Sequence, residues 1–228
     1  MASSDEIVDE IAGFALFADL ATPQLERVAH TFEEQVYAEG ERVLRQGLSG
    51  SAFHVILDGD AAVVIDGDER ATLGRGDFFG EVSILLGQAP VADIVATHQL
   101  RCLVLAGNLV QPFLLDNPPV MYRMLQAQAR RLRQGLSGSA FHVILDGDAA
   151  VVIDGDERAS LGRGDFFGEV SILLGQAPVA DIVATHQLRC LVLAGHLVQP
   201  FLLDNPPVMY RMLQAQARRL RQANRWRS

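Results

Sequence analysis

The sequence predicts a mainly β fold with flanking helices, present twice. Between Gln35 and Leu105, short apolar runs alternate with Asp-Gly and other turns, typically about eight to twelve residues apart. The segments on either side have apolar residues at intervals of three and four, which is typical of amphipathic helices. The third observation is an internal repeat, because residues 46–133 and 134–221 align without a gap. Many short strands in series favour a β-sandwich or barrel.

Composition limits the class of protein. The 228 residues are 49% hydrophobic and 21% charged, enough apolar material for one large core or two modest ones. The longest apolar runs, about five to seven residues, are far too short for a membrane span. The N-terminus is acidic, unlike a signal or transit peptide, and the net charge of -9 argues against a nucleic-acid-binding surface over the whole protein. We therefore expect a cytoplasmic protein.

Two helices are expected before the strands. Residues 5–20 form the first, and Thr22 is expected to cap a second that starts at Pro23. Strands are then predicted at residues 35–38, 42–45, 53–57, 61–65, 70–73, 94–97 and 100–105. The apolar face of the first helix is formed by Ile7, Ile11, Phe14 and Phe17.

After Gly107 the pattern becomes helical again, and Asn117-Pro118 marks the start of a long helix. An apolar stripe on this helix packs either on its own domain or on a second copy of the helix, and the spacing leaves both open. The stripe consists of Met121, Leu125, Gln128 and Leu132.

The sequence contains no arrangement that predicts catalysis or a metal site. Cys102 and Cys190 occupy equivalent strand positions and are expected to be small buried apolar residues. His54 and His98 stand singly in strands, without a ligand partner at a suitable spacing. We find no Ser/His/Asp or Cys/His spacing, no metal-ligand cluster and no Walker-type loop, so neither an enzyme nor a metal protein is expected.

One stretch, Gly76–Val95, carries the best candidate for a binding site. It recurs letter for letter at Gly164–Val183. A Gly-Asp turn leads through two phenylalanines into a short helix, so free backbone N–H groups are available for an anion, and Glu81 stands beside them. This suits a ligand that carries a phosphate and hydroxyls, such as a nucleotide. An ordinary turn-helix corner explains the same pattern.

The two repeats match at 86 of 88 positions and differ only at Thr72/Ser160 and Asn108/His196. Such identity indicates a duplication that is recent or was made deliberately. It predicts a complete domain at residues 1–133 (copy 1) and a truncated one at 134–228 (copy 2), which has no counterpart of the N-terminal helices and first strand. We expect the copy 1 helix to run to about Leu132, leaving copy 2 with an unpaired sheet edge, weaker and open to swapping or association.

With these pieces in place, residues 1–133 resemble a cyclic nucleotide-binding domain of the catabolite activator protein type. Arg45-Gln46-Gly47, Gly50, Phe53–Leu57 and Gly59 are similar to the signature of the family's roll, and Gly76–Leu86 to the start of its phosphate-binding cassette. The resemblance implies a double-stranded β-helix, a jelly-roll type β-roll, in each copy. It also implies that Gly80-Glu81 and Gly168-Glu169 supply a backbone amide for the cyclic phosphate and a carboxylate for the ribose.

The end of the cassette departs from the family pattern. Where the family has Arg and then Ser or Thr, this chain has Val91 and Ala92, followed by Asp93. The change predicts that conventional binding of cyclic AMP or cyclic GMP is weakened. The candidate ligand-binding residues are Gly80, Glu81, Val82, Ser83, Val91 and Ala92, with Gly168, Glu169, Val170, Ser171, Val179 and Ala180 in copy 2.

Two functions from different classes follow. The first is a non-catalytic regulatory module that senses a nucleotide-like effector and moves the helix at Val120–Arg133. The second is a degenerate structural or dimerisation module, or a designed duplicate, with no small-molecule ligand. In either case a homodimer through Val120–Arg133 or its repeat is expected. We expect no DNA-reading domain, because neither helix is followed here by a helix-turn-helix segment.

Overall fold

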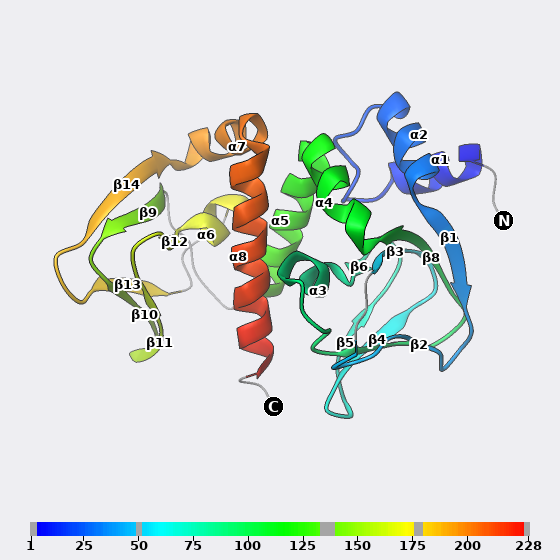
Figure 1. Ribbon diagram of the computed structural model, residues 1–228, viewed down its shortest axis with the longest axis horizontal. Coiled ribbons are helices and arrows are strands. Elements are labelled where there is room, and N and C mark those ends of the chain that lie inside the picture. The colour runs from blue at the N-terminus through cyan, green and yellow to red at the C-terminus, as the bar shows by residue number, and fades with distance from the viewer. Residues whose placement is uncertain (1–3, 49–51, 133–139, 176–179, 226–228) are drawn as a thin grey trace. The chain divides into compact units, whose positions relative to one another are not determined.

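The computed structural model describes residues 4–48, 52–132, 140–175 and 180–225, whose elements are shown in Figure 1. The chain divides into two compact units whose limits differ from those of the repeats. The first unit consists of Met1–Met124 and Tyr210–Ser228, and the second of Leu125–Met209. Each unit therefore contains part of the long helix that ends the other copy.

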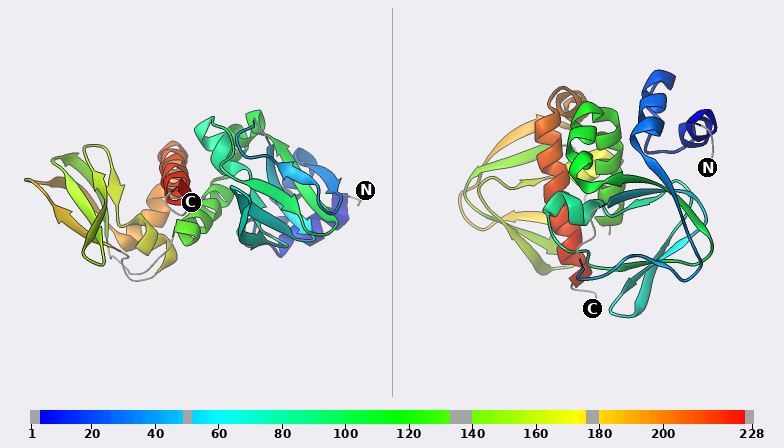
Figure 2. Two further views of the ribbon diagram at one scale, coloured as in Figure 1. Left: turned by 90° about the horizontal axis from the view of Figure 1, so that it is seen from below. Right: turned by 45° about the vertical axis from the view of Figure 1, so that its right-hand side comes forward.

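Helices of the first unit flank the strands of copy 1, and α1 and α2 lie together beside the roll (Figure 2). The helices are α1 (Ser4–Ala12), α2 (Thr22–Thr31), α3 (Glu81–Leu86), α4 (Gly107–Asp116), the start of α5 (Pro118–Leu132), and α8 (Pro206–Arg225) from residue 210. No helix formed by the described residues is both long and apolar enough to cross a bilayer.

Two four-stranded antiparallel sheets form the roll of copy 1, in the orders β1-β8-β3-β6 and β2-β7-β4-β5. Ile56, Cys102 and Val104 from the first sheet share a core with Leu44 and Ile94 from the second. The strands are β1 (Glu33–Tyr37), β2 (Arg42–Leu44), β3 (Ala52–Asp58), β4 (Ala61–Ile65), β5 (Asp68–Leu73), β6 (Phe78–Phe79), β7 (Asp93–Ala96) and β8 (Leu100–Ala106).

Copy 2 has two three-stranded sheets in place of four-stranded ones, in the orders β11-β10-β13 and β12-β9-β14. The prediction of a continuous helix is confirmed, because α5 runs to Leu132 and its last residues cannot also form a counterpart of β2. Because no described strand takes the place of β2, the sheet of copy 2 has the predicted unpaired edge. The elements are β9 (Ala140–Asp146), β10 (Ala149–Ile153), β11 (Asp156–Leu161), β12 (Phe166–Phe167), α6 (Glu169–Leu174), β13 (Asp181–Ala184), β14 (Arg189–Ala194) and α7 (Gly195–Asp204).

Three expectations are wrong in detail. The first helix ends at Ala12, because Gly13 is a poor helix former and the chain continues in tight turns, such as Phe14 N to Ile11 O at 3.0 Å. These turns repeat every three residues, so they keep Phe14 buried without a helix. The N-cap of α2 is Ala21 instead of Thr22. Cys190 is only half-buried, because copy 2 lacks the elements that cover Cys102.

Candidate functional site

The cassette of copy 1 begins with a turn that only glycine accommodates. Gly80 has φ 89°, and a Cβ there would collide with the carbonyl oxygen of Ala52. Gly168 has φ 87° and meets Ala140 in the same way. This close approach brings the N-termini of α3 and α6 against β3 and β9, so both copies build the same corner. Sequence pattern alone correctly predicted the short helix that follows it.

The first side chains of these helices are buried. Glu81 and Glu169 are each 1% exposed, and Ser83 and Ser171 are also buried, while Val82 and Val170 are half-buried. The hydroxyl of Ser83 donates to Gly80 O at 3.0 Å. Glu81 and Glu169 each already take part in an interaction within the fold.

The end of the copy 1 cassette is fastened to the roll through Asp93. Its Oδ1 accepts a hydrogen bond from Gln46 N at 2.7 Å, and its Oδ2 lies 3.2 Å from Arg42 Nη1. Shortly before Asp93 in the sequence, Pro90 O accepts a hydrogen bond from Gly47 N at 2.9 Å. Between these anchors, Val91 is half-buried and Ala92 is buried. The carboxylate of Asp93 thus has a structural role that its position in the sequence did not reveal.

Among the described residues of copy 2, no such contact fastens the same segment. The counterpart of Arg42 is Arg130, which lies in α5. Asp181 is exposed and Ala180 is half-buried. The predicted site residue Val179 lies outside the described residues. The two cassettes therefore share their first half, but they differ in the burial of Ala180 and the exposure of Asp181.

Each cassette is contacted by the long helix that ends the other copy. In the first unit, Gln214 Nε2 of α8 donates to Leu85 O of α3 at 3.1 Å. In the second unit, Gln126 Nε2 of α5 donates to Leu173 O of α6, also at 3.1 Å. Arg221 adds a bond from Nη1 to Ala89 O at 2.7 Å. Sequence reasoning missed this exchange, although Gln126/Gln214 and Leu85/Leu173 occupy equivalent repeat positions.

The apolar stripe on the long helix is buried where it is described. Met121, Leu125 and Gln128 are fully buried, while the side chain of Leu132 lies outside the described residues. The side-chain amides of Gln128 and of its counterpart Gln216 have no hydrogen-bond partner within the described part of the chain. Three of the four residues of the stripe are therefore buried.

Burial shifts the pKa values of two other titratable groups of the roll. Burial lowers the pKa of His54 to about 4, and its Nε2 lies 3.1 Å from Tyr37 Oη. Burial also raises the pKa of the Cys102 thiol to about 12, which keeps it protonated and unreactive. Among the described residues, no group of three or more His, Cys, Asp or Glu is arranged to hold a metal ion.

Comparison with known proteins identifies the fold. The chain is 28% identical over 215 residues to a cAMP-dependent protein kinase regulatory subunit from Blastocladiella emersonii, covering 77% of this chain and 53% of the relative. It is 24% identical over 206 residues to one from Yarrowia lipolytica, covering 76% of this chain and 55% of the relative. The chain thus spans about half the length of these relatives.

Solved structures give similar matches. The regulatory domain of Toxoplasma gondii PKA, co-crystallised with cAMP, is 18% identical with a TM-score of 0.45, covering 94% of this chain and 96% of that one. The regulatory subunit of a cAMP-independent protein kinase A from Trypanosoma cruzi, bound to guanosine, is 19% identical with a TM-score of 0.47, covering 92% and 87%. The profile of the "Cyclic nucleotide-binding domain" matches residues 34–117 and again 123–205. With both copies matched, the chain belongs to the cyclic nucleotide-binding domain family.

Proposed function

We propose that the chain is a non-catalytic regulatory module whose cassettes bind a nucleotide-like effector, and that it binds cyclic AMP and cyclic GMP only weakly. The observation that carries the proposal is the contrast within one cassette. Gly80 and Glu81 keep the turn and the buried carboxylate, while Val91 and Ala92 stand where the family has a cation and a hydroxyl.

The size of the expected defect follows from the lost contacts. A charge-assisted hydrogen bond is worth about 1.5–3 kcal/mol, and an unpaired phosphate charge adds to the cost. Losing an arginine with two such bonds and a hydroxyl therefore removes about 4 kcal/mol or more. This corresponds to a dissociation constant that is weaker on the order of a thousandfold. A nucleoside, which has no phosphate, would be spared that loss.

The exchanged helices give the effector a route to the rest of the chain. Gln214 and Arg221 donate to carbonyl groups on either side of the turn that ends α3. An effector that displaces this turn changes the contact with α8. Arg221 also brings a guanidinium to the rim of the copy 1 cassette, which favours an anionic ligand there.

Isothermal titration with cyclic AMP, cyclic GMP, adenosine and guanosine tests the proposal. We expect Val91→Arg/Ala92→Ser to bind cyclic AMP on the order of a thousandfold more tightly than the unchanged chain. The matched form for copy 2 is Val179→Arg/Ala180→Ser. Micromolar binding of cyclic AMP by the unchanged chain would overturn the expected weakness. No gain in either form would place the phosphate elsewhere.

A structural module without a small-molecule ligand is the alternative, and the anchoring of Asp93 favours it. Its carboxylate binds Gln46 and Arg42, so the end of the cassette links β7 to β2 and to the residues that follow β2. Under this alternative, none of the four compounds binds, and Asp93→Asn destabilises copy 1 without any effect on a ligand.

A further inference from the structure

In copy 1 the N-terminal segment, residues 4–37, covers one face of the β1-β8-β3-β6 sheet. The ring of Phe32 packs edge-on against Phe113 at 5.2 Å and Phe53 at 6.2 Å. The guanidinium of Arg75 lies 5.1 Å over the ring of Phe14. Beneath this cover Leu57 and Leu103 are completely buried. The strand of the segment, β1, completes the sheet by pairing antiparallel with β8.

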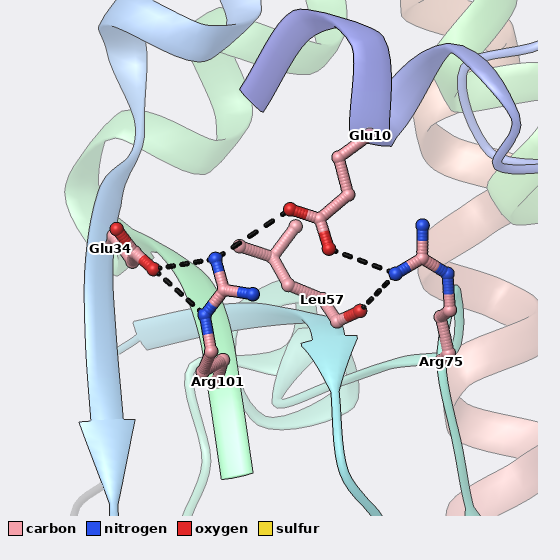
Figure 3. A network of polar contacts seen from close by, with 5 residues as sticks. All are labelled: Glu10, Glu34, Leu57, Arg75 and Arg101. Carbon is pink, nitrogen blue, oxygen red and sulfur yellow. Dashed lines mark hydrogen bonds and ion pairs between the residues drawn. The ribbon is translucent and has the colours of Figure 1, made fainter. Parts of the chain in front are cut away.

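Two carboxylates fix the segment to the sheet (Figure 3). Glu10 of α1 lies 2.9 Å from Arg75 Nη1 and 3.6 Å from Arg101 Nη2. Glu34 of β1 accepts hydrogen bonds from Arg101 Nε at 3.0 Å and Nη2 at 2.8 Å. The hydrogen bond with Glu34 raises the pKa of Arg101 further above its ordinary value. Charge and apolar contact thus act together at this face.

Copy 2 has the same face without the cover. Leu191 is 60% exposed where Leu103 is 0%, Leu145 is 39% exposed where Leu57 is 0%, and Phe201 is 39% exposed where Phe113 is 7%. Among the described strands β14 pairs with β9 alone, so its other edge offers unpaired backbone groups. We call this surface, made of Leu145, Leu191, Phe201 and the open edge of β14, the bare face.

The charges of the bare face are also uncovered. Arg163 and Arg189 are the counterparts of Arg75 and Arg101, and both are exposed. Neither forms an ion pair with any described residue. The segment that satisfies the same two arginines in copy 1 is strongly acidic, since residues 4–37 hold eight carboxylates and one arginine.

We propose that the bare face of copy 2 is a docking site for an acidic helix–helix–strand segment with the pattern of residues 4–37, supplied by a separate polypeptide. Copy 1 serves as the template, because the sequence beneath the segment is repeated almost without change. The strand of the partner adds to β14, its apolar side chains cover Leu145, Leu191 and Phe201, and its carboxylates pair with Arg163 and Arg189.

A second copy of the chain is a poorer occupant. It can donate its own residues 4–37 only by uncovering its own copy 1. Swapping this segment between two chains therefore leaves the number of covered faces unchanged, and it does not by itself favour association. A partner that brings an additional segment covers a face that is otherwise open, and so gains the full burial of apolar surface.

Fluorescence anisotropy of a labelled peptide of residues 4–37, titrated with the full chain, tests the proposal. We expect saturable one-to-one binding. Arg163→Glu/Arg189→Glu should weaken it on the order of tenfold or more, and a peptide carrying Glu10→Arg and Glu34→Arg should restore it. Arg158→Glu is the matched control, because Arg158 is an exposed arginine of copy 2 that pairs with Asp156 on β11.

A second measurement covers the case in which the free peptide binds weakly because it must fold first. The segment is fused to the C-terminus through a flexible linker, which raises its effective concentration to the millimolar range. Hydrogen exchange should then slow at β14 amides. No protection in the fusion, no response to the charge exchange, or self-association that the peptide does not suppress would overturn the proposal.

Discussion

The two copies have almost the same sequence and the same local structure, yet they differ in what they bury. His54 stacks on Phe79 and His142 on Phe167 at the same centroid separation, 4.6 Å. By contrast Leu103 is fully buried, whereas Leu191 is one of the most exposed apolar residues described. Turns and short helices are therefore set by nearby residues, while burial is set by segments far away in the sequence.

The largest expected effect comes from truncating the leucine that differs most between the copies. Leu103→Ala should destabilise copy 1 by about 2–5 kcal/mol, because it leaves a cavity in a packed core. Leu191→Ala should change copy 2 by less than about 0.5 kcal/mol, because its side chain is already in water. Native-state hydrogen exchange at β8 and β14 measures the two separately. Equal losses would contradict the contrast in burial.

The second effect is a pH dependence of the stability of copy 1. The folded pKa of His54, about 4, is below its unfolded value of 6.5, so the stability from the neutral ring is fully present above pH 6.5. It is lost as the pH falls from about 6.5 to about 4, by about 3 kcal/mol in total.

Unfolding of copy 1 between pH 7 and pH 4 should therefore depend on His54, and His54→Gln should flatten the profile. NMR titration of the ring gives the pKa directly. A value near 6.5 would remove the effect. Tyr37→Phe removes the hydroxyl that lies 3.1 Å from His54 Nε2, and this contact comes from β1, which copy 2 lacks.

A smaller effect is expected from the arginines. Arg101→Ala should cost copy 1 about 1–2 kcal/mol, because it strips Glu34 of its charged partner at a partly buried position. Arg189→Ala should be neutral, since the exposed Arg189 forms no ion pair with a described residue. Urea melts of the two variants compare them, and a loss for Arg189→Ala would reveal a partner.

The smallest effect concerns the exchanged helices, where the copies should agree. Gln214→Ala and Gln126→Ala each remove one side-chain bond to a cassette carbonyl, worth about 0.5–1.5 kcal/mol. We expect faster hydrogen exchange at the amides of α3 in Gln214→Ala and at the amides of α6 in Gln126→Ala. The reverse assignment would show that each helix stays with its own copy.

Much of the roll could be predicted because its signals are local. Asp-Gly turns and short apolar runs place β3, β4 and β5 within a residue or two of their observed bounds. The turn at Gly80 was equally predictable, because its shape depends on glycine. The contact of each long helix with the cassette of the other copy could not be predicted, because near-identical repeats give each helix two equally suitable cassettes. The anchoring of Asp93 was not predictable either, because it depends on Gln46, which is 47 positions away in the sequence.

The exchanged helices also change what a cut in the chain would do. Cleavage just before α8 removes the C-terminal end of copy 2, yet the carbonyl groups left without donors are those of Leu85 and Ala89, 129 and 132 positions upstream of Gln214 and Arg221. Cleavage by a protease near Asn205 would therefore remove contacts from the first cassette and leave those of the second in place. The position of the cut along the sequence would suggest the opposite.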